Sequence, residues 1–164
     1  MLIELLITMT FISVAIGALL AVYASTTISL RNSSISGNAT TLVDTQMETF
    51  KTLPYAAIAI DQTTVPGGSD AYVTTPPTNL TTGQQAAIST GQRVGGTYAA
   101  TQTLTGPDGR SYRVDTYAFP LTPAGGQGGV QITVAARSIT AGTLGPIRAQ
   151  VTSAFDIATT REAT

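Results

Sequence analysis

The feature that most constrains this chain is an apolar segment near its N-terminus, which carries no charged residue from Leu5 to Leu30. Glu4 is the one charged residue before Arg31. A segment of this length and composition is typical of a membrane-spanning helix. A carboxylate in such a helix costs about 2.5–3.5 kcal/mol at the bilayer centre, so we expect Glu4 to have a partner. Because Glu4 lies one turn from the chain start, we expect that partner to be the terminal amine of a neighbouring copy.

The string Leu2-Ile3-Glu4-Leu5-Leu6, followed by a long hydrophobic helix, resembles the N-terminus of mature type IV pilins and pseudopilins. In that family the glutamate is the fifth residue of the mature chain. Here it is the fourth, so we expect one residue to be missing before Met1. The resemblance implies a bacterial subunit that is cleaved by prepilin peptidase, methylated, held in the inner membrane, and then built into a cell-surface filament of identical copies by a pilus assembly machinery. The residues that the resemblance assigns to assembly are Met1, Glu4, Leu5, Leu6 and Phe11.

Two other interpretations of the same segment remain open. A secretory signal peptide is one, with Val22-Tyr23-Ala24 as the cleavage site. The segment has no basic region before its apolar run, however, and the run is longer than is usual in signal peptides. A single-pass membrane anchor is the other interpretation.

Gly17 is a weak point within the apolar segment. A glycine inside a helix costs about 1 kcal/mol relative to alanine. It predicts either local unwinding of residues 14–22 in an assembled filament or a site where a second helix approaches closely.

After Arg31 the helical pattern becomes amphipathic. It ends near Leu53, because Pro54 disfavours the helical conformation in the residue before it. A helix over residues 1–53 would be about 80 Å long, which is more than a domain of this size can bury. The apolar residues that recur every three or four positions are Ile35, Ala39, Leu42, Val43, Met47 and Phe50.

The rest of the chain predicts a surface segment over residues 54–96, a sheet over 97–158 and a tail over 159–164. Residues 54–96 show loop chemistry with little periodicity. A period of two then predicts strands at 98–105, 111–119, 130–137 and 147–157, with a turn at Gly106-Pro107-Asp108-Gly109. The predicted fold is α+β: a long N-terminal helix whose C-terminal half packs on the apolar face of a four-stranded antiparallel sheet.

Composition excludes several kinds of chemistry. The chain has no cysteine and no histidine, so disulfides, thiol and imidazole chemistry and most transition-metal sites are absent. Charged residues make up 10% and the net charge is −1, which argues against a nucleic-acid surface. Turns or solvated strand faces account for the carboxylates, and residues 125–129 form a glycine-rich hairpin loop without the lysine of a phosphate-binding loop. We therefore predict no catalytic, cofactor or metal site. The carboxylates considered are Asp61, Asp70, Asp108 and Asp115.

Threonine is abundant, and two explanations are open. Threonine favours strands and solvates a surface without charge. Segments rich in threonine and proline are also typical of O-linked glycosylation. Acceptor motifs for N-linked glycans occur at Asn32, Asn38 and Asn79, of which Asn79 is favoured because the others lie on the predicted helix. The O-linked candidates are Thr63, Thr64, Thr74, Thr75, Thr78, Thr81 and Thr82.

Together these features predict a structural subunit of an extracellular filament that polymerises through residues 1–30. A minor pseudopilin of a secretion system and a membrane-anchored binding module are the alternatives. The first would enter a filament at low copy number, and the second would remain a monomer in the membrane.

Overall fold

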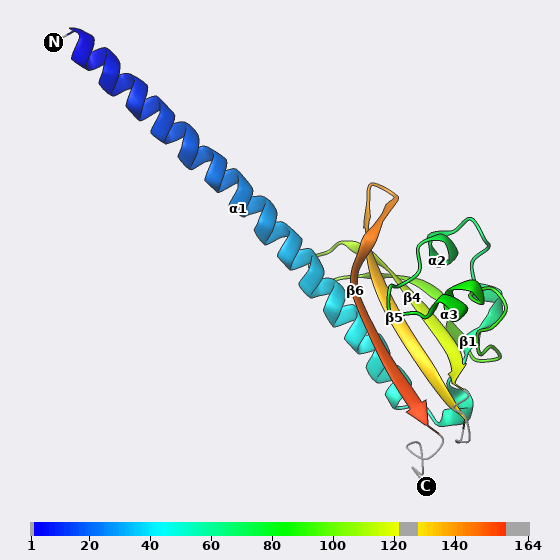
Figure 1. The fold of residues 1–164 in the computed structure, drawn as a ribbon. Coiled ribbons are helices and arrows are strands. Elements are labelled where there is room, and N and C mark those ends of the chain that lie inside the picture. Colours follow the sequence, from blue (N-terminus) through cyan, green and yellow to red (C-terminus); the bar gives the residue numbers. More distant parts are fainter. Residues whose placement is uncertain (1, 122–127, 157–164) are drawn as a thin grey trace. The chain divides into compact units, whose positions relative to one another are not determined.

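The structure is a computed structural model that describes residues 2–121 and 128–156 (Figure 1). Met1, most of the predicted 125–129 loop and the 159–164 tail lie outside the described residues. The chain divides into two compact units, residues 1–35 and residues 36–164, and each is described by itself.

One helix, α1, extends from Leu2 to Lys51, which agrees with the predicted element to within two residues at its C-terminal end. The backbone N–H of Leu53 still bonds to the Phe50 carbonyl at 3.2 Å before Pro54 ends the pattern. The helix is continuous through Gly17. Unwinding of residues 14–22 inside a filament therefore stays a prediction.

The second unit contains the four-stranded antiparallel sheet that the period of two predicts. Its strands are β3 (Thr101–Thr105), β4 (Ser111–Leu121), β5 (Gly129–Thr140) and β6 (Thr143–Asp156), paired in that order. β5 and β6 are longer than predicted, because the residues between them make a tight hairpin in which Ala141 and Gly142 both have positive φ, at 50° and 78°.

The predicted strand 98–105 is divided into two. β2 (Tyr98–Ala99) pairs in parallel with β1 (Ile60–Asp61), and β3 begins after Ala100. The division has a local cause, since the backbone N–H of Ala100 donates to the Thr64 hydroxyl at 2.7 Å rather than to a neighbouring strand.

Residues 36–51 of α1 cover one face of the sheet. Gln102 of β3 donates to Gln46 at 2.7 Å, and the rings of Phe50 and Tyr98 lie 5.1 Å apart. The α+β prediction is confirmed. Of the predicted apolar row, Leu42 is half-buried and the others are buried: Ile35, Ala39, Val43, Met47 and Phe50.

The opposite face of the sheet is covered by residues 62–92, which we call the outer segment. It includes η2 (Gln62–Thr64), α2 (Ala71–Thr74) and α3 (Thr82–Ala86), and it follows η1 (Tyr55–Ala57) and β1. Tyr72 of α2 stacks on Tyr117 of β4 with 4.2 Å between ring centroids, and Gln84 donates to Gln131 of β5 at 3.1 Å. The second unit therefore has three layers, with the sheet in the middle.

Candidate assembly surface and buried charge cluster

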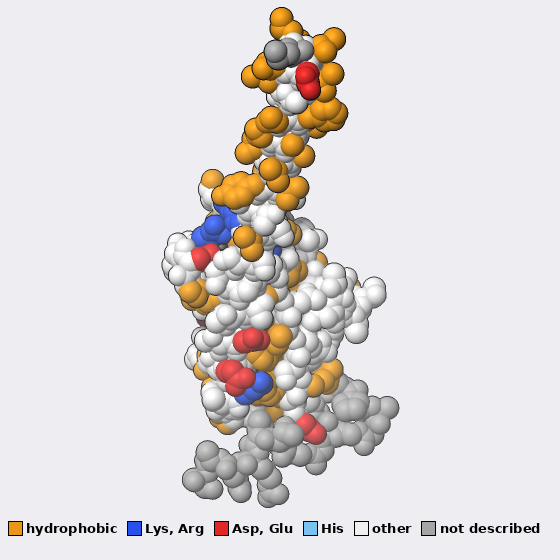
Figure 2. Space-filling view, turned by 90° about the vertical axis from the view of Figure 1, so that its left-hand side faces the viewer, with side chains coloured by type: hydrophobic (Ala, Val, Ile, Leu, Met, Phe, Trp, Pro, Cys, Tyr) orange, Lys and Arg blue, Asp and Glu red, His pale blue; other side chains and the backbone are white. Residues whose placement is uncertain are grey.

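The side chains of residues 2–34 are all exposed, although most of them are apolar. The exposed fractions of three predicted assembly residues are 60% for Leu5, 63% for Leu6 and 73% for Phe11. Figure 2 shows hydrophobic side chains along the visible side of this helical segment. A continuous apolar surface on this scale needs lipid or protein to cover it.

The hydroxyl groups of this segment do not interrupt its apolar character. Thr10 donates to the Leu6 carbonyl at 2.8 Å, and Ser13 donates to the Met9 carbonyl at 2.8 Å. Thr8, Thr26 and Thr27 bond back to their own helix in the same way. Because a carbonyl of the preceding turn accepts from each of these five hydroxyls, they can enter an apolar environment at a reduced cost of lost hydrogen bonds to water.

Glu4 is an exposed carboxylate on this surface. Over residues 2–121 and 128–156, no hydrogen bond or ion pair reaches its side chain. Met1, the other end of the predicted contact, lies outside the described residues. The pairing of Glu4 with an amine of a neighbouring copy therefore stays a prediction.

By length and composition α1 can cross a membrane, with a mean hydropathy of 2.5 over its most apolar window. A signal sequence near the N-terminus would meet the same criteria. The structure thus agrees with a membrane anchor at the coarse level of an apolar helix.

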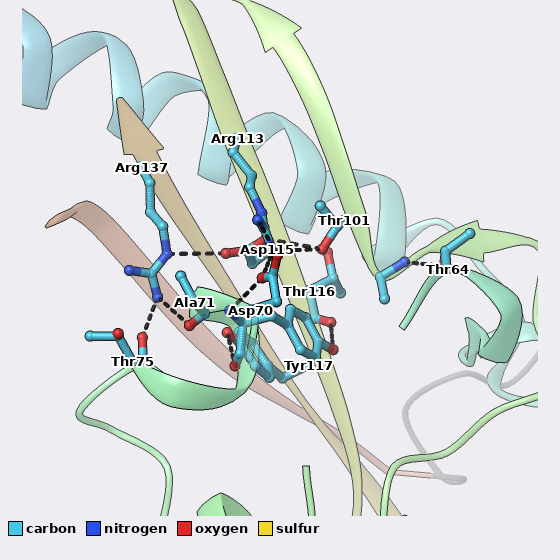
Figure 3. Close-up of polar contacts among 12 residues, drawn as sticks. Thr64, Asp70, Ala71, Thr75, Thr101, Arg113, Asp115, Thr116, Tyr117 and Arg137 are labelled. Atoms are coloured by element: carbon cyan, nitrogen blue, oxygen red, sulfur yellow. Dashed lines mark hydrogen bonds and ion pairs between the residues drawn. The ribbon is translucent and has the colours of Figure 1, made fainter. Parts of the chain in front are cut away.

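A cluster of four charged residues, two of them buried, lies between the sheet and α2 (Figure 3). The Nε atom of Arg113 donates to one carboxylate oxygen of Asp115 at 2.7 Å, and the Nε atom of Arg137 donates to the other at 3.1 Å. Both terminal nitrogens of Arg113 also donate hydrogen bonds to the Asp70 carboxylate. The side chain of Asp115 is 0% exposed and that of Arg137 is 2% exposed. We call Asp70, Arg113, Asp115 and Arg137 the charge cluster.

The prediction that Asp115 lies on a solvated strand face is wrong. Asp115 does lie on the face opposite the helix, but the outer segment covers it there, and its side chain is 0% exposed. Arg113 of β4 is directly opposite Arg137 of β5, which would be destabilising without an anion between them. A sequence signal existed: Arg113 and Asp115 share one face of a largely apolar strand, and Arg137 is the last residue of the predicted strand 130–137.

The charge cluster holds α2 against the sheet. The Asp70 carboxylate accepts from the backbone N–H of Tyr72 at 2.8 Å and so caps α2. Arg137 donates to the carbonyl oxygens of Ala71 and Thr75 at the two ends of the same helix. The hydrogen bonds from Arg113 lower the pKa of Asp70 below its ordinary value. Asp70 therefore stays ionised in mildly acidic solution and keeps its place in the cluster.

The remaining carboxylates lie in turns and caps, as predicted. Asp61 caps η2 by accepting from the Thr63 backbone N–H at 2.9 Å. Asp108 accepts from the Tyr112 hydroxyl at 2.9 Å within the predicted turn, where Gly109 has φ of 72°. Within the described residues, no three carboxylates are placed to hold a metal ion.

The predicted glycosylation sites differ in access. Thr64 is half-buried, and its hydroxyl both accepts from Ala100 and donates to the Asp61 carbonyl at 2.7 Å. Thr82 is exposed, with no hydrogen bond to its hydroxyl among the described residues. The exposed candidates are Thr63, Thr74, Thr75, Thr78, Asn79, Thr81 and Thr82.

Several exposed candidates are tied to their surroundings. Asn79 donates its side-chain amide to Thr152, and Thr78 accepts from Gln150 at 3.2 Å. Thr81 caps α3 by accepting from the Gln84 backbone N–H at 3.2 Å. Of this set, Thr75 and Thr82 are exposed residues whose hydroxyls make no hydrogen bond among the described residues, so they can be modified with the least loss of existing contacts.

Comparisons with protein families, with curated proteins and with solved structures give no match for this chain. Its function is therefore inferred from its own residues and geometry.

Proposed function

We propose that this protein is a structural subunit of an extracellular, type IV pilus-like filament, and that copies assemble through residues 2–30 of α1. The observation that carries the proposal is the exposed apolar surface of this segment, which contains one charge, Glu4, in a chain whose second unit buries its own core. Burial of apolar surface contributes about 25 cal/mol per Å², so packing of these helices against one another would dominate association.

Lipid alone is a poorer cover for this surface than other copies of the chain. In lipid the Glu4 carboxylate has no partner, whereas in a bundle of parallel helices it can meet the terminal amine of a neighbouring copy. We infer that the segment lies in the inner membrane before assembly and in the filament core afterwards. The segment from Leu5 to Leu30 suits both states, because it carries no charge and five of its hydroxyls donate to carbonyl oxygens of their own helix.

Substitution of the apolar segment tests the proposal. In the full chain, Leu6→Asp and Phe11→Asp should abolish filaments, because each places a second carboxylate in the helix bundle at a cost of several kcal/mol. Glu4→Ala should also impair assembly, since removal of one partner from a buried pair costs about 3–5 kcal/mol. Filaments are scored by electron microscopy, and the fold of the second unit by near-ultraviolet circular dichroism.

Thr90→Asp is the matched control, because Thr90 is exposed on the second unit and the change adds the same charge. Normal filaments from Leu6→Asp and Phe11→Asp would contradict the proposal. Low-copy incorporation into filaments of other subunits would favour the minor pseudopilin, and a monomer that stays in lipid would favour the membrane-anchored module.

A further inference from the structure

Arg31 and Asp44 are two exposed charges on α1 that have no ion-pair partner among the described residues. The other charges in this part of the helix pair with each other, since Lys51 donates to Glu48 at 2.6 Å. Positions three and four residues away from Arg31 hold only apolar and hydroxyl side chains. The same positions around Asp44 hold no base, and one of them is Glu48. Neither charge can therefore be neutralised along its own helix.

The position of Arg31 makes an unpaired state costly once copies assemble. It directly follows Leu30, the last residue of the apolar segment. When neighbouring helices cover residues 2–30, Arg31 lies at the edge of the apolar bundle and loses part of its hydration. The desolvation of the Arg31 guanidinium costs less when a carboxylate of a neighbouring subunit pairs with it.

The helix geometry sets the kind of contact that these residues can make. Arg31 and Asp44 are 13 positions apart, which in an α-helix corresponds to about 20 Å along the axis and about 220° around it. The two groups thus lie on nearly opposite sides of α1. A two-fold dimer needs both partners of a contact on one patch, whereas groups on opposite sides make a head-to-tail contact that propagates.

We propose that Arg31 of one copy pairs with Asp44 of a parallel neighbouring copy, and that this contact sets the axial offset of the two helices at about 20 Å. The inference rests on the proposed function. Each copy then uses Arg31 toward one neighbour and Asp44 toward another. Arg148 of β6, whose Nε atom is buried without a hydrogen-bond partner in residues 2–121 and 128–156, is the competing base for Asp44.

Charge reversal in the full chain tests the pairing. Arg31→Asp and Asp44→Arg should each lower the assembled fraction at least about tenfold, because each places like charges together. The double variant Arg31→Asp/Asp44→Arg should restore assembly. The control Glu48→Lys/Lys51→Glu exchanges a pair within one helix and should leave assembly unchanged. The assembled fraction is measured by sedimentation and electron microscopy at low salt.

A second measurement uses the absence of cysteine in the chain. Arg31→Cys/Asp44→Cys filaments treated with a short bis-maleimide should give a ladder of covalent oligomers. Either single variant should give no product beyond a dimer, because a head-to-tail contact needs both residues.

The outcomes separate this inference from the function on which it rests. Wild-type filaments with unaffected single reversals and no ladder would overturn the pairing alone. Rescue of Asp44→Arg by Arg148→Asp, and not by Arg31→Asp, would also overturn it. Failure of the wild-type chain to form filaments at all would overturn the proposed function together with the pairing.

Discussion

Two threonines in the middle of the sheet are equally buried, but their hydroxyl groups have different surroundings. Thr116 of β4 and Thr133 of β5 are both 0% exposed. The hydroxyl of Thr133 bonds to the hydroxyl of Thr152 at 2.8 Å, whereas that of Thr116 has no hydrogen-bond partner among the described residues. A buried polar group without a hydrogen-bond partner costs about 1–3 kcal/mol, so the Thr116 hydroxyl lowers the free energy of unfolding.

Thr116→Val is therefore expected to raise the free energy of unfolding by about 1 kcal/mol, because it replaces the unpaired hydroxyl with a methyl group of similar size. Thr133→Val is the matched control and should lower it by about 0.5–1.5 kcal/mol, because it removes a hydrogen bond. Urea unfolding of the full chain in detergent measures both. A loss of stability in Thr116→Val as large as in Thr133→Val would show that the Thr116 hydroxyl has a partner after all.

At the scale of elements, ion pairs and hydrogen bonds from two arginines hold α2 against the sheet. Arg137 donates to carbonyl oxygens at both ends of α2, and Arg113 binds the capping residue Asp70. The stacked rings of Tyr72 and Tyr117 add an apolar contact at the same place. Because burial raises the pKa of both phenols, they stay neutral over the whole physiological range.

The stabilising effect of Asp70 should depend on pH in a definite direction. Its pKa is lower in the folded chain than the ordinary value of about 3.9. The contribution of the ionised Asp70 carboxylate to the free energy of unfolding is therefore present above pH 4, and it is lost as the pH falls through the folded-state pKa. Asp70→Asn should be less stable than the wild type at pH 7, and the difference should narrow below pH 4.

At pH 7, Asp70→Asn should lower the free energy of unfolding by less than the 3–5 kcal/mol typical of breaking a fully buried pair. The reason is that the Asp70 side chain is 34% exposed, so solvent screens its charge. Urea midpoints from pH 7 to pH 2 measure it, with Glu48→Gln at an exposed pair as the control. A difference that stays constant down to pH 2 would contradict the role of the Asp70 charge.

At the scale of the whole molecule, the exposed surface of the second unit is poor in charge and rich in hydroxyl groups. With 10% charged residues in the chain, solubility depends mainly on neutral polar side chains. Carbohydrate on the outer segment would add hydration and shield backbone from proteases. In the predicted set, Thr82 is exposed and its hydroxyl makes no hydrogen bond among the described residues, whereas Thr64 is half-buried and its hydroxyl is bonded to Ala100 and Asp61.

Glycosylation of the native protein predicts an intact mass above the 16.8 kDa of the bare chain. Peptides that contain Thr82 should carry the added mass, and Thr82→Ala should reduce it. Thr64→Ala is the control and should leave the mass of the glycans unchanged, because the Thr64 hydroxyl is occupied by Ala100 and Asp61. A native subunit of 16.8 kDa would rule out the modification.

The sequence alone determined the long helix, its apolar and amphipathic halves, and the four strands. These features depend on periodicity and on local breakers such as Pro54, which act over a few residues and can be read along the chain. The exposure of Leu5, Leu6 and Phe11 also follows from the sequence, because a helix of this length is too long for so small a domain to cover.

Only the tertiary structure decided that the two central strands, β4 and β5, are buried on both faces and that Asp115 and Arg137 lie inside. Strand periodicity assigns residues to one face or the other, but it carries no information on whether a distant segment returns to cover that face. The outer segment has little periodicity, and its docking depends on long-range contacts such as that between Asp70 and Arg113. The charge cluster therefore exists only because the folded chain brings residues 70–75 onto β4 and β5, where removal of water makes each unpaired charge costly.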